Sequence, residues 1–589
     1  MDSKKRSSRR YDFDWLRVAA TLVVFLFHST RFFNQRDYVV NNAVTYEWVN
    51  IWCIFAMSWL MPLFFIISGV SLFYGIGKYD NRRQFVADKF LRLMIPVMVG
   101  SVTHCALQVY LERVSHGLFS GSIIAFIPHY FDGIYSGIGQ QNGNFSFVGM
   151  HLWYLLFFFI YCLIFYRLFV WLKGSGEILL ERISSLFTMP GLIYIWLSIP
   201  LMVMYIVIPP AALTIGAGDW GFFYYPWFLT AGFIIASSPR LQQFIQAQRR
   251  RSLFLGLLLS TVYFYLPLSP PNMLYPAAGG HWAATAVSFL NTWCWLLAIL
   301  GFGMQRLNVN HPFLRYANEG VLPFYIVHQS ILVIIGYFIV TLEINDIFKW
   351  MFIAGSSFIL IIALHAFLIR RFDPLRFLFG LKTKHPFFHL FQKRGALLAM
   401  TAAYVGLIIF AATGISIDRT PMPLSYDAER DIILNFKSIT RRSSTGVNLV
   451  ADKEASVGKA IEFSSGANQP AKTKPRVYAE MEFSAPAGRY FVWLRGKSEM
   501  NHQADSAWLQ LDDDIGTPTG NFQVGDWCNL HPSGLYAWAG DGDRPIAIEL
   551  SHNGTHKIRI QPRQTPHRID QIWLSRSQKR IPDVPRYIR

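Results

Sequence analysis

Two ionisable residues, Arg17 and His28, lie in an apolar segment near the start of the 589-residue chain. Ionisable side chains are costly at membrane depth, so their presence there is by default a functional hypothesis. Eleven residues make about three helical turns, so both side chains project from one face, about 16 Å apart along the axis. A neutral histidine in a partly dry site is a suitable general base for a hydroxyl group. Contacts with headgroups or a neighbouring helix would account for either residue alone better than for the pair.

Other polar and aromatic residues stand at the edges or in the middle of later apolar stretches. His151 begins one of these stretches and is followed by Trp153, while Tyr325 and His328 lie within another. We expect Trp153 and Tyr325 to line a cavity and the two histidines to contribute polar groups to it. A transport protein would also keep buried polar residues, so these positions alone do not separate an enzyme from a transporter.

Lys89 and Arg92 lie where a third apolar stretch begins. Lysine and arginine bind phosphates well, so this pair would suit a phosphorylated donor molecule. The alternative is that both residues are ordinary positive charges flanking a membrane helix.

The composition indicates a membrane protein. Hydrophobic residues make up 52% of the chain and charged residues only 15%, whereas soluble domains carry about a quarter. The net charge of +18 would suggest nucleic acid as a partner. That interpretation fails because the basic residues cluster in short loops between apolar runs, a pattern typical of membrane topology. We therefore expect the lipid bilayer as a partner and no nucleic acid.

The apolar runs predict a polytopic α-helical bundle of ten core transmembrane helices and an eleventh. Basic segments fall on one side if ten helices precede residue 370, and that side is the cytoplasm, with the N-terminus. No small-x-small cleavage site follows the basic N-terminus, so the first helix is expected to remain uncleaved. The five cysteines have no paired spacing and imply neither a disulfide framework nor a metal site. The predicted helices are 15–34, 49–75, 93–112, 149–172, 188–209, 222–238, 253–269, 282–303, 320–341, 349–369 and 396–417.

The last predicted helix carries the chain to the non-cytoplasmic side, where the pattern changes to short alternating runs. Such runs, with a strong hairpin signal at Asn553-Gly554, predict an all-β sandwich. The predicted domains are a cytoplasmic tail (1–14), a transmembrane domain (15–380), a cytoplasmic loop (381–395), the eleventh helix (396–417), a linker with first strands (418–475) and the β-sandwich (476–589).

Five short motifs in order resemble the acyltransferase 3 family of integral-membrane acyltransferases. The closest subgroup is the one that contains the periplasmic glucan succinylation protein C. The resemblance covers about residues 10–380. The motifs are Arg17 with His28, residues 64–69, Lys89 with Arg92 and Pro96, residues 151–154, and residues 323–329.

The resemblance implies an enzyme that takes an acyl group from cytoplasmic acyl-CoA and passes it to a hydroxyl, commonly of a carbohydrate. It implies that Arg17 and His28 are the essential pair, with His28 as the base. Lys89 and Arg92 match an Arg-x-x-Arg element thought to help hold the donor. Lysine at position 89 keeps the charge but loses the bidentate fork of arginine, so Arg92 is the stronger donor contact.

The C-terminal domain resembles jelly-roll carbohydrate-binding modules of the galactose-binding-like type. Trp527, Tyr536 and Trp538 are candidate sugar-stacking residues, against a purely structural domain as the alternative. Strand alternation instead assigns Trp493 and Trp508, with Trp573, to the core.

Taken together, the sequence predicts a bacterial inner-membrane O-acyltransferase with a periplasmic or extracellular C-terminal domain. Acyl-CoA is its expected donor, acetyl or succinyl its expected acyl group, and an extracytoplasmic glycan its acceptor, with no bound cofactor or metal. The sequence leaves the oligomeric state open. One alternative is a transporter or flippase, which would show internal repeats and discontinuous helices. Another is a glycan-binding envelope protein without catalysis, which would leave Arg17 and His28 unexplained.

Overall fold

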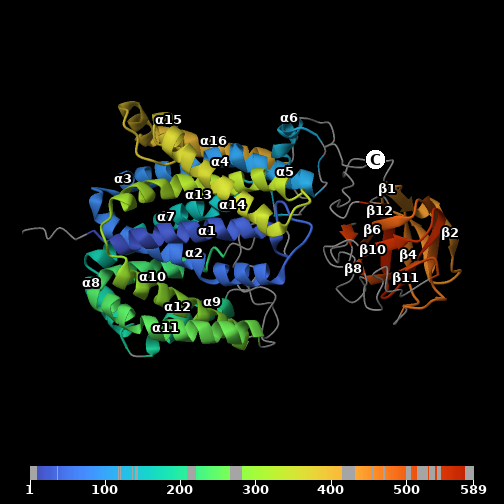
Figure 1. Ribbon diagram of the computed structural model, residues 1–589, viewed down its shortest axis with the longest axis horizontal. Helices are drawn as coiled ribbons and strands as arrows, with labels where there is room; N and C mark the ends of the chain where they lie inside the picture. The colour runs from blue at the N-terminus through green and yellow to red at the C-terminus, as the bar shows by residue number, and fades with distance from the viewer. Residues whose placement is uncertain are drawn as a thin grey trace, which may run out of the picture. The chain divides into compact units, whose positions relative to one another are not determined.

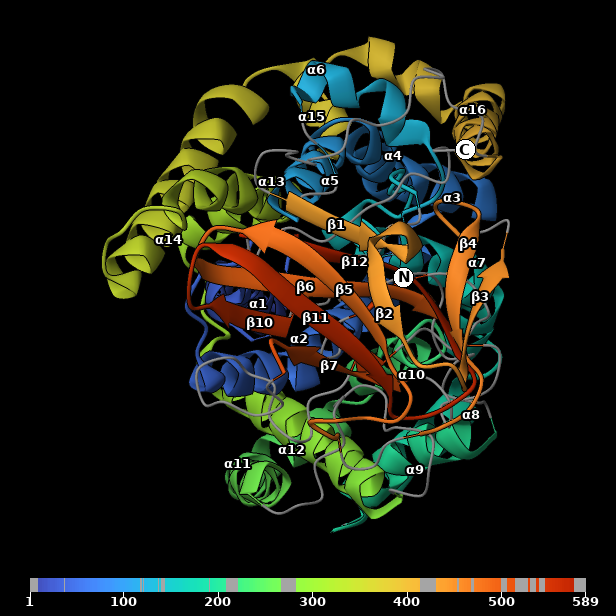
Figure 2. The ribbon, with the colours of Figure 1, turned by 90° about the vertical axis from the view of Figure 1, so that its right-hand side faces the viewer.

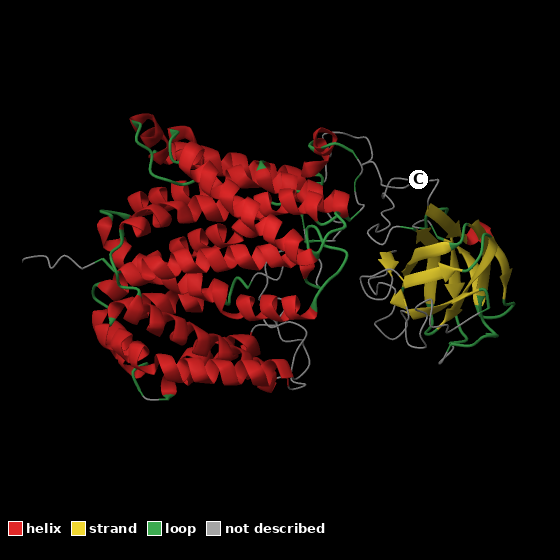
Figure 3. Cartoon of the chain, in the orientation of Figure 1, coloured by secondary structure: helices red, strands yellow, loops and turns green. Residues whose placement is uncertain are grey.

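The chain forms two compact units, one helical and one made of strands (Figure 3). The first comprises Met1–Glu112 and Ile127–Ile417, and the second comprises Arg113–Phe126 and Asp418–Arg589. The computed structural model describes residues 9–35, 38–116, 119, 121–135, 137–138, 143–189, 191–207, 221–265, 282–413, 431–452, 455–467, 471–498, 506–513, 528–529, 537–539 and 546–576.

Helices account for almost all of the first unit (Figure 1). Among the described residues, two short π-helical turns interrupt them, Phe90–Met94 before α4 and Leu364–Ile369 after α14. The helices are α1 (Tyr11–Thr30), α2 (Glu47–Gly75), α3 (Arg82–Lys89), α4 (Ile95–Val102), α5 (His104–Ser115), α7 (Trp153–Lys173), α8 (Glu177–Leu186), α9 (Leu192–Val207), α10 (Tyr225–Ser237), α11 (Pro239–Tyr265), α12 (Trp282–Arg306), α13 (Pro312–Ile339), α14 (Asp346–Ala363), α15 (Asp373–Leu378) and α16 (Arg394–Ala412), with α6 (Ile123–Phe126) assigned to the second unit.

Within the described ranges, eight helical segments are long and apolar enough to cross a membrane, and α9 and α10 are apolar but shorter. The sequence placed a helix at 253–269, whereas α11 begins at Pro239 and continues through Arg249–Arg251. Proline suits the first turn of a helix, where its missing N–H is not needed. These three arginines therefore lie in a helix and not in one of the short loops to which the sequence assigned the basic clusters. The eight segments are Tyr11–Phe33, Glu47–Lys78, Arg82–Ser115, Met150–Lys173, Thr285–Arg306, Pro312–Ile339, Asp346–Ile369 and Arg394–Ala412.

Helix α1 packs between α2 and α13 (Figure 1). Helix α2 runs in the opposite direction, because Ser71 near its end bonds Arg17 near the start of α1. At the other end, Cys53 of α2 contacts Thr30 of α1, with sulfur and oxygen 3.9 Å apart. The polar residues of α1 therefore face partners that come from distant parts of the chain.

The second unit contains two antiparallel sheets (Figure 2). The seven-stranded sheet has the order β10-β6-β12-β4-β3, with β1 also paired to β12 and β9 to β6, and the five-stranded sheet has the order β2-β5-β11-β7-β8. The strands are β1 (Asp431–Asn435), β2 (Ile439–Arg442), β3 (Val447–Ala451), β4 (Lys459–Phe463), β5 (Ala479–Ala485), β6 (Gly488–Lys497), β7 (Ser506–Leu511), β8 (Cys528–Asn529), β9 (Ala537–Ala539), β10 (Ile546–Leu550), β11 (Gly554–Pro562) and β12 (His567–Ser575).

One hydrophobic core is shared by both sheets and includes Val492 and Leu494 of β6 and Leu509 of β7. Successive side chains of a strand point to opposite faces. Trp493, which lies between two core residues, therefore faces away from this core, although it is only 3% exposed. The same alternation applies to Trp508 and Trp573, so all three tryptophans are buried, as expected, but on the outer faces of their sheets.

Candidate active site

Arg17 is anchored by side chains from two other helices. Its guanidinium donates to Asn318 Oδ1 of α13 at 3.2 Å and to Ser71 Oγ of α2 at 2.8 Å. Asp14, one turn earlier on α1, lies 3.8 Å away and also accepts from Asn318 at 3.0 Å and from Arg9 at 2.8 Å. A single carboxylate is thus shared among three donors, which leaves Arg17 only partly neutralised.

Lys89 and Arg92 interact electrostatically with Arg17 and so belong to the same end of the bundle. The Lys89 ammonium lies 5.5 Å from the centre of the Phe85 ring. Across the residues that the structure describes, neither Lys89 nor the exposed Arg92 forms an ion pair with a carboxylate. We name Arg17, Lys89 and Arg92 the cationic cluster. Three like charges in one place favour a polyanionic ligand such as a phosphate group.

Arg92 lies in the π-helical turn Phe90–Met94, directly before α4. Such turns are rare and frequently occur at functional sites. The backbone of Gly380, which has a φ of +66°, packs directly against the Arg92 carbonyl. This turn is therefore braced by a residue almost 300 positions later, at the end of the segment that the sequence predicted as the transmembrane domain.

His28 lies toward the opposite end of α1 from Arg17. Its ring packs against that of His328 of α13, with ring centroids 5.1 Å apart. His28 is half-buried, and its Nδ1 lies 3.4 Å from the Tyr38 hydroxyl, a long hydrogen bond. Burial raises the pKa of Tyr38 above its ordinary value, so its hydroxyl stays neutral. In the tautomer in which Nδ1–H donates to the Tyr38 oxygen, Nε2 carries a lone pair, and Nε2 has no hydrogen-bond partner among the described residues.

His328 and His151 are held by backbone carbonyls, which fixes the nitrogen that carries the proton. His328 Nδ1 donates to the Tyr325 carbonyl at 2.6 Å, and His151 Nε2 donates to the Ile326 carbonyl at 2.9 Å. Carbonyls only accept, so the other nitrogen of each neutral ring carries a lone pair. Within the described part of the chain, neither lone pair has a partner. Both histidines are buried, His328 with 1% and His151 with 6% of its surface exposed. Each therefore has a buried acceptor nitrogen that a ligand could donate a hydrogen bond to.

The row of histidines extends beyond His328. His151 lies 5.1 Å from His328 and 6.2 Å from His104, between ring centroids, and Nε2 of His104 has no partner within the described ranges. We name His28, His328, His151 and His104 the histidine chain. The other ring nitrogen of His104, Nδ1, lies 3.3 Å from the Thr103 hydroxyl.

The two aromatic candidates lie beside the histidine chain. The Tyr325 hydroxyl donates to the His151 carbonyl, and the Tyr154 ring lies 6.1 Å from the Tyr325 ring. Tyr154 in turn bonds Ser68 of α2 at 2.5 Å between oxygens. Trp153 is buried against Tyr225, with centroids 5.2 Å apart. These rings therefore lie between the cationic cluster and the histidine chain.

Sequence reasoning missed several site residues. Asn318, Ser71 and Tyr38 contact the two polar residues of α1, but none of them lies in the sequence motifs. Ser71 is a polar residue within an apolar stretch, a signal that it shares with many structural residues, and Asn318 lies before the start of the predicted helix 320–341.

The sugar-stacking candidates of the second unit divide into two groups. Trp527 and Tyr536 lie outside the described residues. Trp538 of β9 is half-buried and packs on Trp573, with ring centroids 6.2 Å apart. Trp493 is the cross-strand partner of Trp573, so the three indoles gather on the outer face of the seven-stranded sheet.

The acyltransferase domain of the acyltransferase 3 family matches residues 10–367, more than half of the chain. The chain therefore belongs to this family, and it is an acyltransferase, as the resemblance in the sequence indicated. Among its relatives are the glucans biosynthesis proteins C of Salmonella paratyphi A and Salmonella agona. Each is 22% identical over 389 residues, covering 63% of this chain and 94% of the relative.

Structural comparison finds carbohydrate-binding modules. One is the C-terminal family 6 module of LamC, a laminarinase of Zobellia galactanivorans (11% identical, 25% of this chain, 99% of the module, TM-score 0.18). Another is a family 6 module of Clostridium cellulolyticum in complex with xylose (15% identical, 24% of this chain, 96% of the module, TM-score 0.18).

Proposed function

We propose that the protein is a membrane O-acyltransferase that moves an acetyl or succinyl group from cytoplasmic acyl-CoA to a hydroxyl of an extracytoplasmic glycan. One observation carries this proposal. A single face of α1 carries Arg17 of the cationic cluster toward one end and, about 16 Å away, His28, whose histidine neighbours have acceptor nitrogens without partners among the described residues. Such a face suits a long donor with phosphates at one end and a reactive thioester at the other.

The donor end is the cationic cluster. Arg92, Lys89 and Arg17 would hold the phosphates of coenzyme A, with Arg92 as the stronger contact because guanidinium binds phosphate through a fork. Acyl-CoA is a substrate in this mechanism, and no bound cofactor takes part. The basic segments at this end support its assignment to the cytoplasm.

The chemistry takes place at the histidine chain. The lone pair of His28 Nε2 accepts the proton of the acceptor hydroxyl, whose oxygen attacks the thioester carbonyl. The tetrahedral intermediate then collapses, the C–S bond breaks, and the thiolate of coenzyme A takes up the proton held by His28. His328 and His151 would accept hydrogen bonds from the glycan, and Trp153 with Tyr325 would exclude water.

The proposal also assigns each segment of the chain to a side of the membrane. Ten helices form the catalytic bundle in the inner membrane (15–380), with residues 1–14 and 381–395 in the cytoplasm. An eleventh helix (396–417) carries the chain across, and residues 418–475 supply a linker and the first strands of a periplasmic or extracellular β-sandwich, whose other strands lie within 476–589. This domain would hold the glycan through Trp527, Tyr536 and Trp538. The relatives' name, which refers to glucans, supports a glucan as one acceptor to test first.

The test uses the purified full-length protein with radiolabelled acetyl-CoA or succinyl-CoA and glycans from the cell envelope. We expect label in the glycan, and a loss of about 10²–10⁴-fold in His28→Ala, the range for a general base. His389→Ala, which removes an exposed histidine, is the matched control. Unchanged transfer in His28→Ala would contradict the mechanism. Glycan movement across vesicles without any transfer from acyl-CoA would favour the transporter instead.

A further inference from the structure

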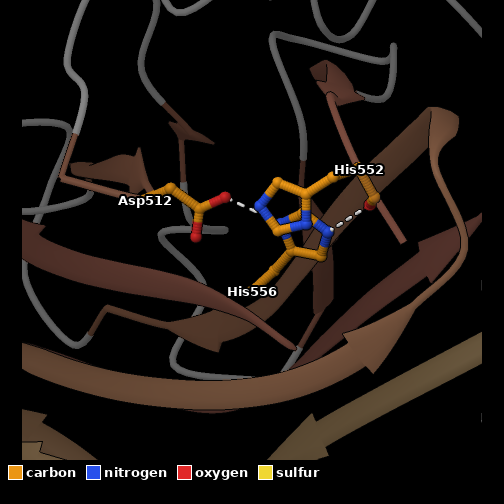
Figure 4. Close-up of side chains that lie close together, drawn as sticks. All are labelled: Asp512, His552 and His556. Atoms are coloured by element: carbon orange, nitrogen blue, oxygen red, sulfur yellow. Dashed lines mark hydrogen bonds and ion pairs between the residues drawn. The ribbon is translucent and has the colours of Figure 1, made fainter. Parts of the chain in front are cut away.

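Three side chains of types that bind metals lie close together in the second unit (Figure 4). Asp512 follows the last residue of β7, His552 lies in the turn between β10 and β11, and His556 lies in β11. Their ligand atoms all lie within 4.8 Å of one another. The sequence predicts no metal site here, because the aspartate is 40 residues from the first histidine and only strand pairing brings them together.

The pairing of β7 with β11 brings Asp512 close to His556. Leu511 is the register partner of Ile558, so the residues that follow β7 lie beside the start of β11. The Asp512 N–H donates to the Lys557 carbonyl at 2.9 Å, and the Lys557 N–H donates to Asp512 Oδ1 at 2.7 Å. Asp512 and Asp513 have φ angles of +46° and +66°. Such left-handed conformations are unfavourable for most residues, so this turn is a specific feature that aims the Asp512 carboxylate.

His556 is oriented as a metal ligand would be. Its Nε2 donates to the His552 carbonyl at 2.9 Å, and its Nδ1 lies 2.7 Å from Asp512 Oδ2. Histidine ligands of metals usually donate their other ring N–H to a carbonyl or carboxylate, which fixes the tautomer. The imidazole is fully buried and packs beside Phe483, with ring centroids 5.8 Å apart. The orientation of His556 therefore does not depend on the metal.

The other two ligands can adjust. The Asp512 side chain is 39% exposed, and His552 is exposed and stacks on His556 with ring centroids 4.5 Å apart. Zinc–ligand bonds of about 2.0–2.2 Å require tetrahedral ligand atoms about 3.4 Å apart. The ligand atoms lie within 4.8 Å of one another, so changes of up to about 1.4 Å in their separations, made by exposed side chains, would produce this geometry. By contrast, the neighbouring Asp513 ion-pairs with Arg559 at 2.8 Å and is directed elsewhere.

We propose that Asp512, His552 and His556 form a zinc site. Two imidazoles and one carboxylate suit zinc, whereas calcium takes six to eight oxygen ligands. Three protein ligands leave a fourth position for water, on the exposed side of the cluster. The metal would tie the end of β7 to the β10–β11 turn, which connects the seven-stranded sheet to the five-stranded sheet.

The test measures zinc in the full-length protein, purified with a tag that contains no histidine, stripped with a chelator and dialysed against zinc. We expect about one zinc per chain by mass spectrometry, falling at least tenfold in His552→Ala and in Asp512→Asn. Asp513→Asn is the matched control and should keep its zinc. His552 is exposed, so its removal should not unfold the domain.

A second readout is hydrogen–deuterium exchange of peptides that contain residues 511–513 and 550–558. Zinc should slow their exchange in the wild-type protein and leave it unchanged in His552→Ala. The proposal is overturned if His552→Ala binds as much zinc as the wild type, if the wild type binds none, or if calcium gives the same protection as zinc.

Discussion

His28 of α1 and His328 of α13 face each other with ring centroids 5.1 Å apart, although 300 residues separate them in the sequence. Eleven residues before His28, Arg17 donates to Asn318, which lies ten residues before His328. The two helices therefore run in the same direction and nearly in register. One helix pair thus carries both ends of the proposed acyl-transfer path. Substitutions at the Arg17 end and at the His28 end should therefore have different effects on the kinetics.

Replacing His328 should weaken binding of the glycan. The substitution removes the buried Nε2 lone pair, so the glycan hydroxyl that would donate to it loses its acceptor. An unmet buried partner costs about 1–3 kcal/mol, so His328→Phe should lower kcat/KM for the acceptor about 10- to 100-fold. His328→Gln restores an acceptor near the Nε2 position and should recover part of the loss. Equal activity of the two variants, measured at saturating acyl-CoA, would show that the lone pair is not used.

Tyr38→Phe should lower kcat without raising KM for acyl-CoA. The Tyr38 oxygen orients His28 from 3.4 Å but belongs to neither substrate site, so its loss should affect only the chemical step. We expect a decrease of about 3- to 10-fold, as for one net hydrogen bond of about 1 kcal/mol. The measurement is steady-state kinetics with both substrates varied. A change confined to KM for either substrate would instead place Tyr38 in direct contact with that substrate.

Arg92→Ala should raise KM for acyl-CoA about 10-fold or more, since a hydrogen bond to a charged group contributes about 1.5–3 kcal/mol. Arg17→Ala should act in the same direction, and Lys89→Ala should have a smaller effect. Donor binding should remain in His28→Ala, which removes the base and not a phosphate contact. The control is Arg83→Ala, an exposed cation on α3. If it raises KM as much as Arg92→Ala does, general surface charge would explain the effect.

The sequence predicted which residues to examine at this site, and the structure added how they are arranged. The apolar runs located α1 and α13, and the helical period placed Arg17 and His28 on one face. The contact with His328 joins segments 300 residues apart, which no local pattern encodes. The free nitrogen of each histidine depends on the backbone carbonyl that takes the other one, and this too requires coordinates.

The strands show a similar limit. Alternation correctly predicted that Trp493 and its counterparts are buried. It could not tell which face of each sheet meets the shared core, because both faces of β6 are apolar. The start of α11 was wrong by 14 residues, since a polar helical segment has no apolar periodicity to reveal it.

The second unit, which is made of strands, should lose stability as the pH falls from about 6.5 to 4. His567 is buried beside Phe463, and burial lowers its pKa to about 4 from the ordinary 6.5. The unfolded state then binds more protons within this window, so the full contribution is present above pH 6.5 and is lost on acidification. The shift corresponds to about 3 kcal/mol. His567→Gln should flatten this dependence.

The measurement is urea unfolding of the full-length protein between pH 4 and 7, followed by hydrogen exchange of peptides from β4 and β12. Carboxylates also titrate near pH 4, so the informative quantity is the difference between the wild type and His567→Gln. A constant difference across this range would mean that His567 is not buried in its neutral form.

Gly380→Ala should disturb the donor site from a distance. Gly380 has a φ of +66°, where a side chain is unfavourable by about 1–2 kcal/mol, and an added Cβ would clash with the Arg92 carbonyl. The π-helical turn that carries Arg92 must then shift, so both the melting temperature and the affinity for acyl-CoA should fall. Gly395→Ala is the matched control, because nothing lies within 4 Å of its added Cβ and its backbone is helical. It should be neutral or slightly stabilising. A melting temperature that falls while KM for acyl-CoA stays constant would separate the stability of this turn from donor binding.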